Sequence, residues 1–304
     1  MKELEYLKII HNTLSDSSFL GDDCALLKEF GLYVTQDTLV EDVHFVLAST
    51  TPFDLAQKAI NVNLSDLAAA LSEPLFVTIS LSIPSSLNNT FVEEFYKGVE
   101  SCCKQYGIKV IGGDLTSSDK IFISICAIGK KNLDIDVSRS FAEVGNVIVT
   151  TGVHGESAAG LKFILDSRDS SDYFVKKHLC PLAQIKKSKQ IAEALNKAGV
   201  KKIAIMDTSD GLGDAIYKIS KASGCYLNIE TIPVSDILKE TFPQSWKNLA
   251  FWGGEDFELL FCVPGEVYNL LDKSQFYKIG TVINQSLSDD LVKDFEDKSF
   301  KHFI

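Results

Sequence analysis

The segment Thr35–Phe45, which reads TQDTLVEDVHF, decides how the rest of the chain is interpreted. It directly follows the apolar run Leu32-Tyr33-Val34, which predicts a strand. Asp37, Glu41, Asp42 and His44 then lie within one short stretch, so several oxygen ligands and an imidazole gather near one strand end. This combination indicates a cation site.

Similar acidic clusters recur along the chain, each beside a glycine or at the end of an apolar run. They are Gly21-Asp22-Asp23, Asn63-Leu64-Ser65-Asp66, Gly112-Gly113-Asp114 and Asp207-Thr208-Ser209-Asp210-Gly211. The strand that begins at Lys109 is predicted to end in the paired glycines, which let another group approach the backbone. We predict that these clusters converge, although acidic residues scattered along a sequence are usually solvated surface groups.

Composition limits the class of protein. The 304 residues are enough for two domains of ordinary size, and 45% hydrophobic residues indicate a folded protein. Acidic residues outnumber basic ones by 41 to 30, which argues against a nucleic-acid partner because phosphate neutralisation needs the opposite balance. No apolar run is long enough for a membrane-spanning helix, and the first residues lack the apolar region of a signal peptide. We therefore expect a cytoplasmic protein with no membrane partner.

The seven cysteines are scattered and include no Cys-x-x-Cys pair, so we expect reduced core residues rather than a zinc or disulfide framework.

The order of predicted elements favours a mixed α/β protein with two domains. A helix starting at Pro52, an alternating strand Leu75–Ile83 and a helical stripe from Phe91 to Tyr106 belong to the first part. The pattern changes near Arg139, where longer helices begin to alternate with short strands. The predicted domains are residues 1–138 and 139–304.

A phosphate-binding loop of the Gly-Lys-Ser/Thr type is absent from the sequence. The most similar segment, Thr151–Lys162, has Leu161 between Gly160 and Lys162, so we reject it. Asp207 and Asp210 instead bracket a hydroxyl at a strand-to-helix turn, where backbone donors favour an anion.

The acidic clusters also predict a chemistry. Converging carboxylates repel one another unless divalent cations lie between them, and oxygen ligands favour Mg²⁺ or Mn²⁺ over zinc. Since Mg²⁺ bridges phosphates in phosphoryl transfer, an ATP-using enzyme without a phosphate-binding loop is the resulting hypothesis.

The ordered set of motifs resembles the thiamine-monophosphate kinase family along nearly the full chain. The motifs are Gly21-Asp22-Asp23, Thr35-Gln36-Asp37-Thr38-Leu39-Val40, His44-Phe45, Asn63-Leu64-Ser65-Asp66-Leu67-Ala68-Ala69, Gly112-Gly113-Asp114, Asp207-Thr208-Ser209-Asp210-Gly211 and Gly253-Gly254-Glu255-Asp256. The wider superfamily, which includes aminoimidazole ribonucleotide synthetase and selenophosphate synthetase, shares the acidic motifs but not this whole set.

The resemblance implies a two-domain aminoimidazole ribonucleotide synthetase-like fold. It also implies a homodimer formed through the N-terminal sheet, with ATP bound between the domains and across the dimer. The implied reaction is direct transfer of the γ-phosphoryl group of ATP to thiamine monophosphate, with several Mg²⁺ ions and no covalent nucleophile.

Site residues follow from the resemblance position by position. The implied Mg²⁺ ligands are Asp23, Thr35, Asp37, Asp66, Asp114, Asp207 and Asp210, of which Asp207 and Asp210 are the implied catalytic residues. The implied nucleotide contacts are Gly113, Asp114, Arg139 and Ser209, and the implied thiamine contacts are His44, Glu255 and Phe300.

Each role has a structural alternative. His44 is also compatible with a half-buried structural histidine, Arg139 with a pin at the domain junction, Glu255 with a group that orients the glycine turn, and Phe300 with tail packing. The sequence departs from the family pattern at Gln36, Asp42, Leu115 and Ser299, which leaves the metal count and the role of the tail open.

Two other functions stay open. One is a different ATP-dependent synthetase of the superfamily; Cys24 follows the acidic pair instead of preceding it, and the chain ends in Phe303-Ile304 rather than cysteine, which disfavours two of these. The other is a catalytically silent Mg-ATP sensor.

Overall fold

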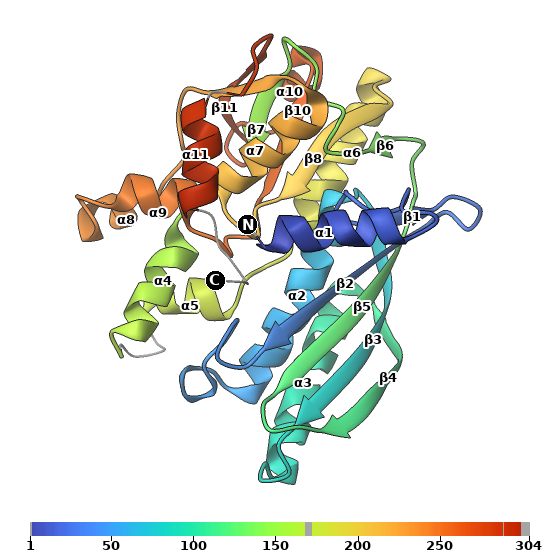
Figure 1. The fold of residues 1–304 in the computed structure, drawn as a ribbon, viewed down its shortest axis with the longest axis vertical. Helices are drawn as coiled ribbons and strands as arrows, with labels where there is room; N and C mark the ends of the chain where they lie inside the picture. Colours follow the sequence, from blue (N-terminus) through green and yellow to red (C-terminus); the bar gives the residue numbers. More distant parts are fainter. Residues whose placement is uncertain (1, 168–171, 288, 299–304) are drawn as a thin grey trace.

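The computed structural model describes residues 2–167, 172–287 and 289–298, and they form two β-sheets flanked by helices (Figure 1). This arrangement agrees with the mixed α/β class that the sequence predicts. None of the described helices is long and apolar enough to cross a membrane.

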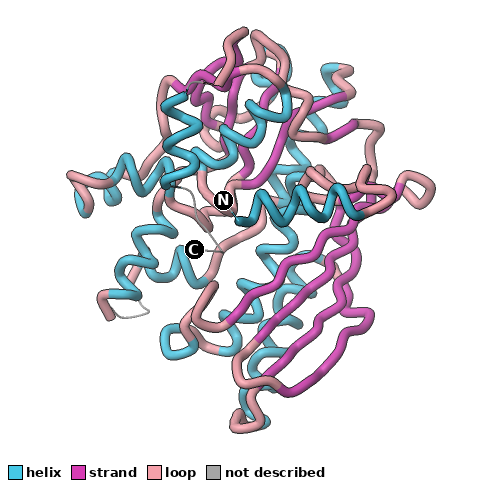
Figure 2. Tube along the Cα trace, in the orientation of Figure 1, coloured by secondary structure: helices cyan, strands magenta, loops and turns pink. Residues whose placement is uncertain are grey.

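The N-terminal half is built on a five-stranded sheet with the order β1-β2-β5-β3-β4. Its strands lie side by side in Figure 2, and β3 and β4 form a parallel pair in an otherwise antiparallel sheet. The strands are β1 (Ala25–Leu27), β2 (Leu32–Val40), β3 (Glu73–Ile83), β4 (Lys109–Ser117) and β5 (Phe122–Lys130). The helices are α1 (Lys2–Thr13), α2 (Pro52–Ala69) and α3 (Asn89–Tyr106), with a short 3₁₀ turn η1 (Leu47–Ser49).

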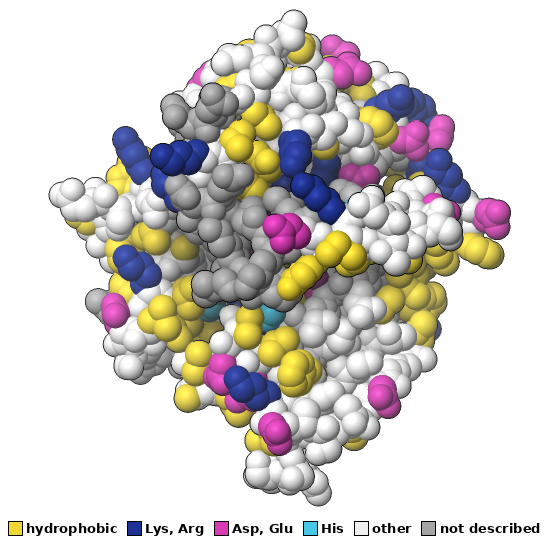
Figure 3. Space-filling model, in the orientation of Figure 1, with side chains coloured by type: hydrophobic (Ala, Val, Ile, Leu, Met, Phe, Trp, Pro, Cys, Tyr) yellow, Lys and Arg dark blue, Asp and Glu magenta, His cyan; other side chains and the backbone are white. Residues whose placement is uncertain are grey.

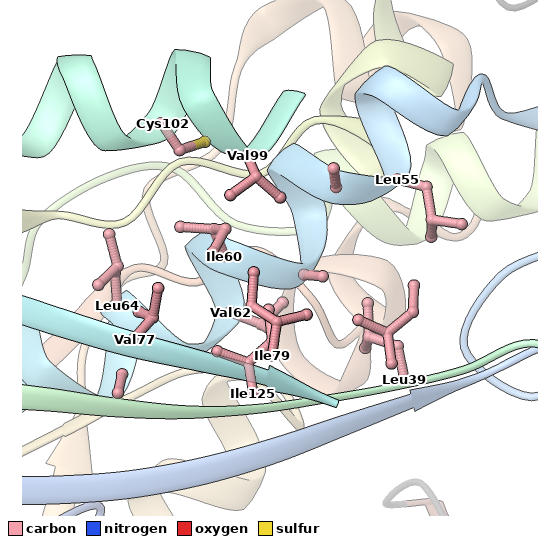
Figure 4. Packing of buried hydrophobic residues seen from close by; sticks show 14 of the residues in the cluster. Leu39, Leu55, Ile60, Val62, Leu64, Val77, Ile79, Val99, Cys102 and Ile125 are labelled. Atoms are coloured by element: carbon pink, nitrogen blue, oxygen red, sulfur yellow. The ribbon is translucent and has the colours of Figure 1, made fainter. Parts of the chain in front are cut away.

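Local sequence signals fix the two long helices. The Thr51 hydroxyl accepts a hydrogen bond from Asp54 N at the start of α2, and Pro52 occupies the first turn, where its missing N–H costs nothing. Asn88 caps α3 in the same way, and Gly107 ends it in a left-handed conformation. Alternating side chains of the central strands belong to one apolar cluster with side chains of α2 and α3, and Figure 4 shows Val77, Ile79 and Ile125 on the side of the strands that faces α2.

The C-terminal half contains a six-stranded sheet with the order β6-β8-β10-β7-β11-β9. Its strands are β6 (Asp136–Val137), β7 (Val147–Thr150), β8 (Lys202–Asp207), β9 (Tyr226–Ile229), β10 (Leu259–Val263) and β11 (Tyr277–Ile283). Its helices are α4 (Glu156–Leu165), α5 (Tyr173–Leu179), α6 (Ile185–Ala198), α7 (Leu212–Ser223), α8 (Asp236–Thr241), α9 (Trp246–Trp252), α10 (Gly265–Leu270) and α11 (Asp289–Lys298).

The end of α2 joins the two halves. Ala68 and Ala69, in its last turn, belong to a core cluster that also contains Ile203 and Phe261 of the second sheet. Small side chains let the helix approach that sheet closely. The relative position of the halves is therefore set largely by one helix.

The border between the domains stays a prediction. β6 pairs in parallel with β8, so the chain has already joined the second sheet before Arg139. We propose that the border lies in residues 131–135, after β5, rather than at 139.

The prediction that a strand ends at Gly112-Gly113-Asp114 is wrong. β4 continues to Ser117 because its register with β3 carries on through Gly113, paired with Ile79, and Asp114, paired with Ser80. A Cβ at Gly113 would lie 1.9 Å from Ile79 O, so the glycine is required by this close strand contact rather than by a turn.

Replacing Phe95 with alanine tests the N-terminal core. Its side chain is 0% exposed on α3, so we expect Phe95→Ala to lower the free energy of unfolding by about 3–5 kcal/mol. The matched control is Tyr96→Ala at the next position, where the ring is 39% exposed and the expected loss is smaller. Equal midpoint shifts for both variants in urea denaturation would contradict this assignment of the core.

Candidate active site

Three carboxylates meet where the two halves of the chain join. Asp23 lies just before β1, Asp66 is on α2, and Asp207 ends β8. One oxygen of each lies within 4.8 Å of the other two, an arrangement that can hold a metal ion. Two of these groups come from the N-terminal half and one from the C-terminal half, so the cluster exists only when the halves pack together.

Neighbouring hydroxyl and amide groups hold these side chains in place. Thr35 Oγ1 on β2 donates to Asp66 Oδ2 at 2.5 Å, and Ser65 Oγ donates to Asp207 Oδ2 at 2.6 Å. Asp37 N donates to Asn63 Oδ1 at 2.9 Å, which fixes β2 against α2. The Asn-Leu-Ser-Asp motif therefore serves as a scaffold, in which Asn63 and Ser65 orient the acidic groups around Asp66.

Burial makes the negative charge of this cluster costly. It raises the pKa of Asp207 to about 7, with the Asp23 carboxylate adding to the effect. Burial also raises the pKa of Asp66 well above its usual range, and Asp207, Asp37 and Asp23 raise it further. Cations at this place would remove the repulsion, which is the electrostatic condition for a divalent ion site.

Arg139 supplies positive charge beside the cluster. Its Nη2 lies 2.5 Å from Asp23 Oδ1, and its backbone N donates to Asp22 Oδ1 at 2.8 Å. The buried Nε has no hydrogen-bond acceptor among the described residues. A buried donor without an acceptor favours an anionic ligand at this position.

Ser209 and Asp210 lie in the turn between β8 and α7. Gly211 precedes the first turn of α7 with φ 104°, and no side chain caps the helix. Lys218, two turns along α7, lies 3.0 Å from Asp210 Oδ2 and 2.7 Å from Asp214 Oδ2. The uncapped N–H groups and this ammonium can bind phosphate oxygens.

The start of α4, by contrast, already holds a carboxyl group of the protein. Asp256 Oδ2 accepts from Gly155 N at 2.6 Å, and its Oδ1 accepts from Ser157 N at 3.0 Å. These are donors that a phosphate-binding loop in Thr151–Lys162 would need, and their occupation agrees with our rejection of that loop.

Gly113 and Asp114 do not reach the cluster within one chain. Asp37 on β2 is in register with Ile125, Ile79 and then Gly113, so three strand spacings, roughly 14 Å, separate β2 from β4. β4 is an edge strand whose residues are all exposed. If these two residues bind the nucleotide, they do so at a place that this chain alone does not complete.

His44 and Glu255 lie beside two buried polar residues, Lys58 and His178. His44 Nδ1 accepts from Val40 N at 3.0 Å, and its carbonyl accepts from the ammonium of Lys58 at 3.3 Å. Burial alone would raise the pKa of Glu255, but the ammonium of Lys58, the largest opposing contribution, holds that pKa below its usual value. Phe300 and Ser299 lie outside the described residues.

The described departures from the family pattern have small structural consequences. Asp42 adopts φ 63°, a left-handed conformation that explains why glycine is common there and that aspartate tolerates. Gln36 is exposed and donates to Ser124 Oγ at 3.1 Å, and Leu115 is exposed on β4. Neither touches the carboxylate cluster through a described hydrogen bond.

Sequence reasoning missed Lys58, His178, Asp214 and Lys218. A lysine in the apolar stretch of α2 is the one signal that could have found Lys58, and the i,i+4 spacing of Asp214 and Lys218 indicates an ion pair. His178 carried no local signal, because its contacts come from residues distant in sequence.

A large cavity lies away from these residues. Its volume is about 720 Å³, and it lies beside α7, β9 and α9, with Trp246, Phe251 and Trp252 in its wall. It contains none of the residues that the sequence assigns to the site. The site is therefore defined by the buried polar groups rather than by this cavity.

The chain is similar to proteins of known families. Residues 21–130 match the family model "AIR synthase related protein, N-terminal domain", so the N-terminal half of the chain is a domain of the AIR synthase-related class. The chain is also 34% identical to the thiamine-monophosphate kinase of Synechococcus elongatus over 301 residues, covering 93% of this chain and 91% of the relative.

Two further comparisons agree. The thiamine-monophosphate kinase of Aquifex aeolicus is 34% identical over 317 residues, covering 99% of this chain and 98% of the relative. A solved structure, AaThiL complexed with AMPPCP and TMP, aligns with a TM-score of 0.87 and 33% identity, covering 100% of this chain and 98% of that chain. The chain belongs to the thiamine-monophosphate kinase family.

The raised pKa of Asp207 predicts how stability depends on pH when divalent cations are chelated. Folded Asp207, with a pKa of about 7 against an ordinary 3.8, binds a proton that the unfolded chain does not bind between these values. We expect the free energy of unfolding to rise as the pH falls from 8 to 5.5, measured by urea denaturation in EDTA. Asp207→Asn should make this rise shallower, with part remaining because the pKa of buried Asp256 is also raised to about 7.

The control for this experiment is Asp119→Asn, at an exposed turn after β4, which should keep the wild-type slope. An Asp207→Asn variant with the unchanged wild-type slope would show that Asp207 does not titrate in this range.

Proposed function

We propose that this protein transfers the γ-phosphoryl group of ATP to thiamine monophosphate, giving thiamine diphosphate and ADP. The observation that carries this proposal is the largely buried cluster of Asp23, Asp66 and Asp207, formed between two halves of a chain that aligns along its whole length with AaThiL complexed with AMPPCP and TMP. In this reaction a phosphate oxygen of thiamine monophosphate attacks the γ-phosphorus, and the bond from that phosphorus to the β-phosphate oxygen of ATP breaks. No covalent intermediate on the protein is required.

The donor set supports Mg²⁺ as part of this proposal. Asp23, Asp66 and Asp207 offer oxygen ligands within 4.8 Å of one another, with Thr35, Asp37 and Asp210 on adjoining elements. Oxygen donors suit Mg²⁺, which when bound would neutralise phosphate charge during transfer. Asp207 and Asp210 bracket the turn before α7, so they are the proposed catalytic acidic groups.

The residues around this cluster have distinct proposed roles. Arg139, with its unpartnered Nε, and Ser209, at the uncapped start of α7, would bind phosphate oxygens of the nucleotide. His44, Glu255 and Phe300 would contact the thiamine part of the acceptor. The cytoplasmic location predicted from the sequence stays a prediction within this proposal.

The proposal includes a homodimer that brings Gly113 and Asp114 to the nucleotide of the partner subunit. β4 is an edge strand exposed along its length, and Ile111 and Leu115 present apolar side chains on it. An exposed edge with apolar side chains favours association with another copy. This would resolve the roughly 14 Å that separates β4 from β2 within one chain.

The direct test is to incubate the protein with ATP, Mg²⁺ and thiamine monophosphate and to separate the thiamine phosphates chromatographically. We expect one thiamine diphosphate for each ADP. ADP without thiamine diphosphate would identify a sister enzyme with another acceptor, and Mg-ATP binding without turnover would identify a sensor.

Asp210→Asn tests the role of the turn before α7. The side chain is 38% exposed, so we expect the free energy of unfolding to change by less than about 1 kcal/mol. Loss of one charged group at the phosphoryl centre should lower kcat at least about 100-fold. Asp236→Asn, at an exposed position on α8, is the control and should keep full turnover. A fully active Asp210→Asn variant would remove Asp210 from the mechanism.

Charges on β4 test the dimer. We expect the double variant Ile111→Glu, Leu115→Glu to raise the dissociation constant of the dimer at least about tenfold, because an interface related by two-fold symmetry would bury like charges. Turnover should fall in parallel, while Leu165→Glu at an exposed position on α4 should change neither. Sedimentation velocity measures the association state. A wild-type monomer with full turnover would contradict this part of the proposal.

A further inference from the structure

A buried ammonium lies between the two halves of the molecule. Lys58 is on α2, and its side chain is only 2% exposed. Its Nζ lies 3.0 Å from Glu255 Oε2 in the C-terminal half and 3.3 Å from the carbonyl oxygen of His44 in the N-terminal half. A buried charge is tolerated only when it is paired. Both groups that accept hydrogen bonds from Lys58 belong to residues proposed to contact thiamine monophosphate, and we call the place around His44 and Glu255 the acceptor pocket.

The backbone of Glu255 is held as firmly as its side chain. It adopts φ 65°, a left-handed conformation that is uncommon for a residue with a side chain, and its N–H donates to Ser209 O at 2.7 Å. Gly254 makes this contact possible, because a Cβ there would lie 2.8 Å from Ser209 O. Glu255 is thereby tied to the loop that carries Ser209 and Asp210.

The two oxygens of the Glu255 carboxylate are used differently. Oε2 accepts from Lys58 and also lies 3.1 Å from His178 Nδ1 on α5, which is itself 3.0 Å from Ser157 Oγ. Among the described residues, Oε1 has no hydrogen-bond partner. Burial lowers the pKa of His178 to about 4, so the imidazole is neutral near pH 7 and Lys58 supplies the charge that balances the carboxylate. One oxygen is anchored, and the other is available to a ligand.

We infer that Lys58 is a positioning residue for thiamine monophosphate. It holds the carboxylate of Glu255, and His178 holds the same carboxylate as a second anchor, through its own side-chain contact. Lys58 holds Glu255 Oε2 and the carbonyl of His44, so that Oε1 is presented to an N–H donor of the acceptor's amino-substituted heteroaromatic ring. This inference rests on the proposed function, because it assigns a role within the thiamine-monophosphate pocket. It does not involve the phosphoryl-transfer step itself.

The geometry of α2 separates this role from that of the carboxylate cluster. Ser65 follows Lys58 by seven residues, which places both on nearly the same face of the helix with roughly 10 Å of axial rise between them. Ser65 bonds to Asp207 at the phosphoryl centre, and Lys58 bonds to Glu255 at the acceptor pocket. Loss of Lys58 should therefore affect binding of the acceptor and leave binding of the nucleotide intact.

The test is Lys58→Met, which removes the charge and keeps the length of the side chain. We expect the KM for thiamine monophosphate to rise at least about tenfold, with the KM for ATP unchanged within twofold and a smaller change in kcat. In the Glu255→Gln background, Lys58→Met should add little, because the carboxylate that it positions is already gone. The control is Lys97→Met, which breaks an exposed pair with Glu93 and Glu94 and should change neither KM.

Equal increases in both KM values, fully additive effects in the double variant, or an unchanged KM for thiamine monophosphate would each overturn the inference. If Lys58→Met does not fold, the double variant Lys58→Met, Glu255→Gln removes both charges of the pair, and His178→Gln tests the second anchor. His178→Gln should raise the KM for thiamine monophosphate alone, and an unchanged value would then count against the inference. Failure of the proposed function is a separate result, since wild-type protein would form no thiamine diphosphate at all.

Discussion

Repulsion among the largely buried carboxylates of Asp23, Asp66 and Asp207 is the constraint on which the rest of the structure depends. Their oxygens lie within 4.8 Å of one another, and burial opposes the charged form of each. Such a cluster works against packing of the two halves, so other contacts must hold them together. The apolar end of α2 in the second core, the Ser65 hydroxyl on Asp207 and the Lys58–Glu255 pair provide these contacts. The repulsion among these carboxylates is thus concentrated at the place where bound cations, with their phosphates, would remove it.

The distribution of apolar side chains on the surface differs between parts of the molecule. Figure 3 shows hydrophobic side chains scattered among charged ones on one face of the molecule, as is usual for folded proteins. The N-terminal sheet differs, because α2 and α3 cover one face and its edge strand β4 keeps exposed apolar side chains at Ile111 and Leu115. Tyr6, Leu7 and Ile10 of α1 are exposed as well. The N-terminal half therefore offers more apolar surface than its own helices cover.

Much of the fold could be predicted from the sequence, because apolar periodicity and caps are local signals. Pro52 marked the start of α2, and alternation marked β3. The end of β4 could not be predicted, since Gly113 is required by the carbonyl of Ile79 on a neighbouring strand, which no local pattern reveals. The same reason applies to the site. Acidic motifs pointed to Asp23, Asp66 and Asp207, whereas Lys58 and His178 act through Glu255, which is 197 residues from Lys58. Sequence patterns reveal groups that carry chemistry more readily than groups that position them.

The contacts of α2 with the C-terminal half let this helix fix the distance between two places in the site. Ser65 of α2 bonds to Asp207, and Lys58 of the same helix bonds to Glu255. The distance between these two contacts is therefore set by the number of residues between Lys58 and Ser65. One inserted residue would lengthen the helix by about 1.5 Å but rotate everything beyond it by about 100°, which would turn one of these side chains away from its partner. Insertions or deletions in α2 therefore cannot change, by small amounts, the length of a ligand that fits between the two contacts. A change in that length would have to come from the loops of the C-terminal half, while the helix stays fixed.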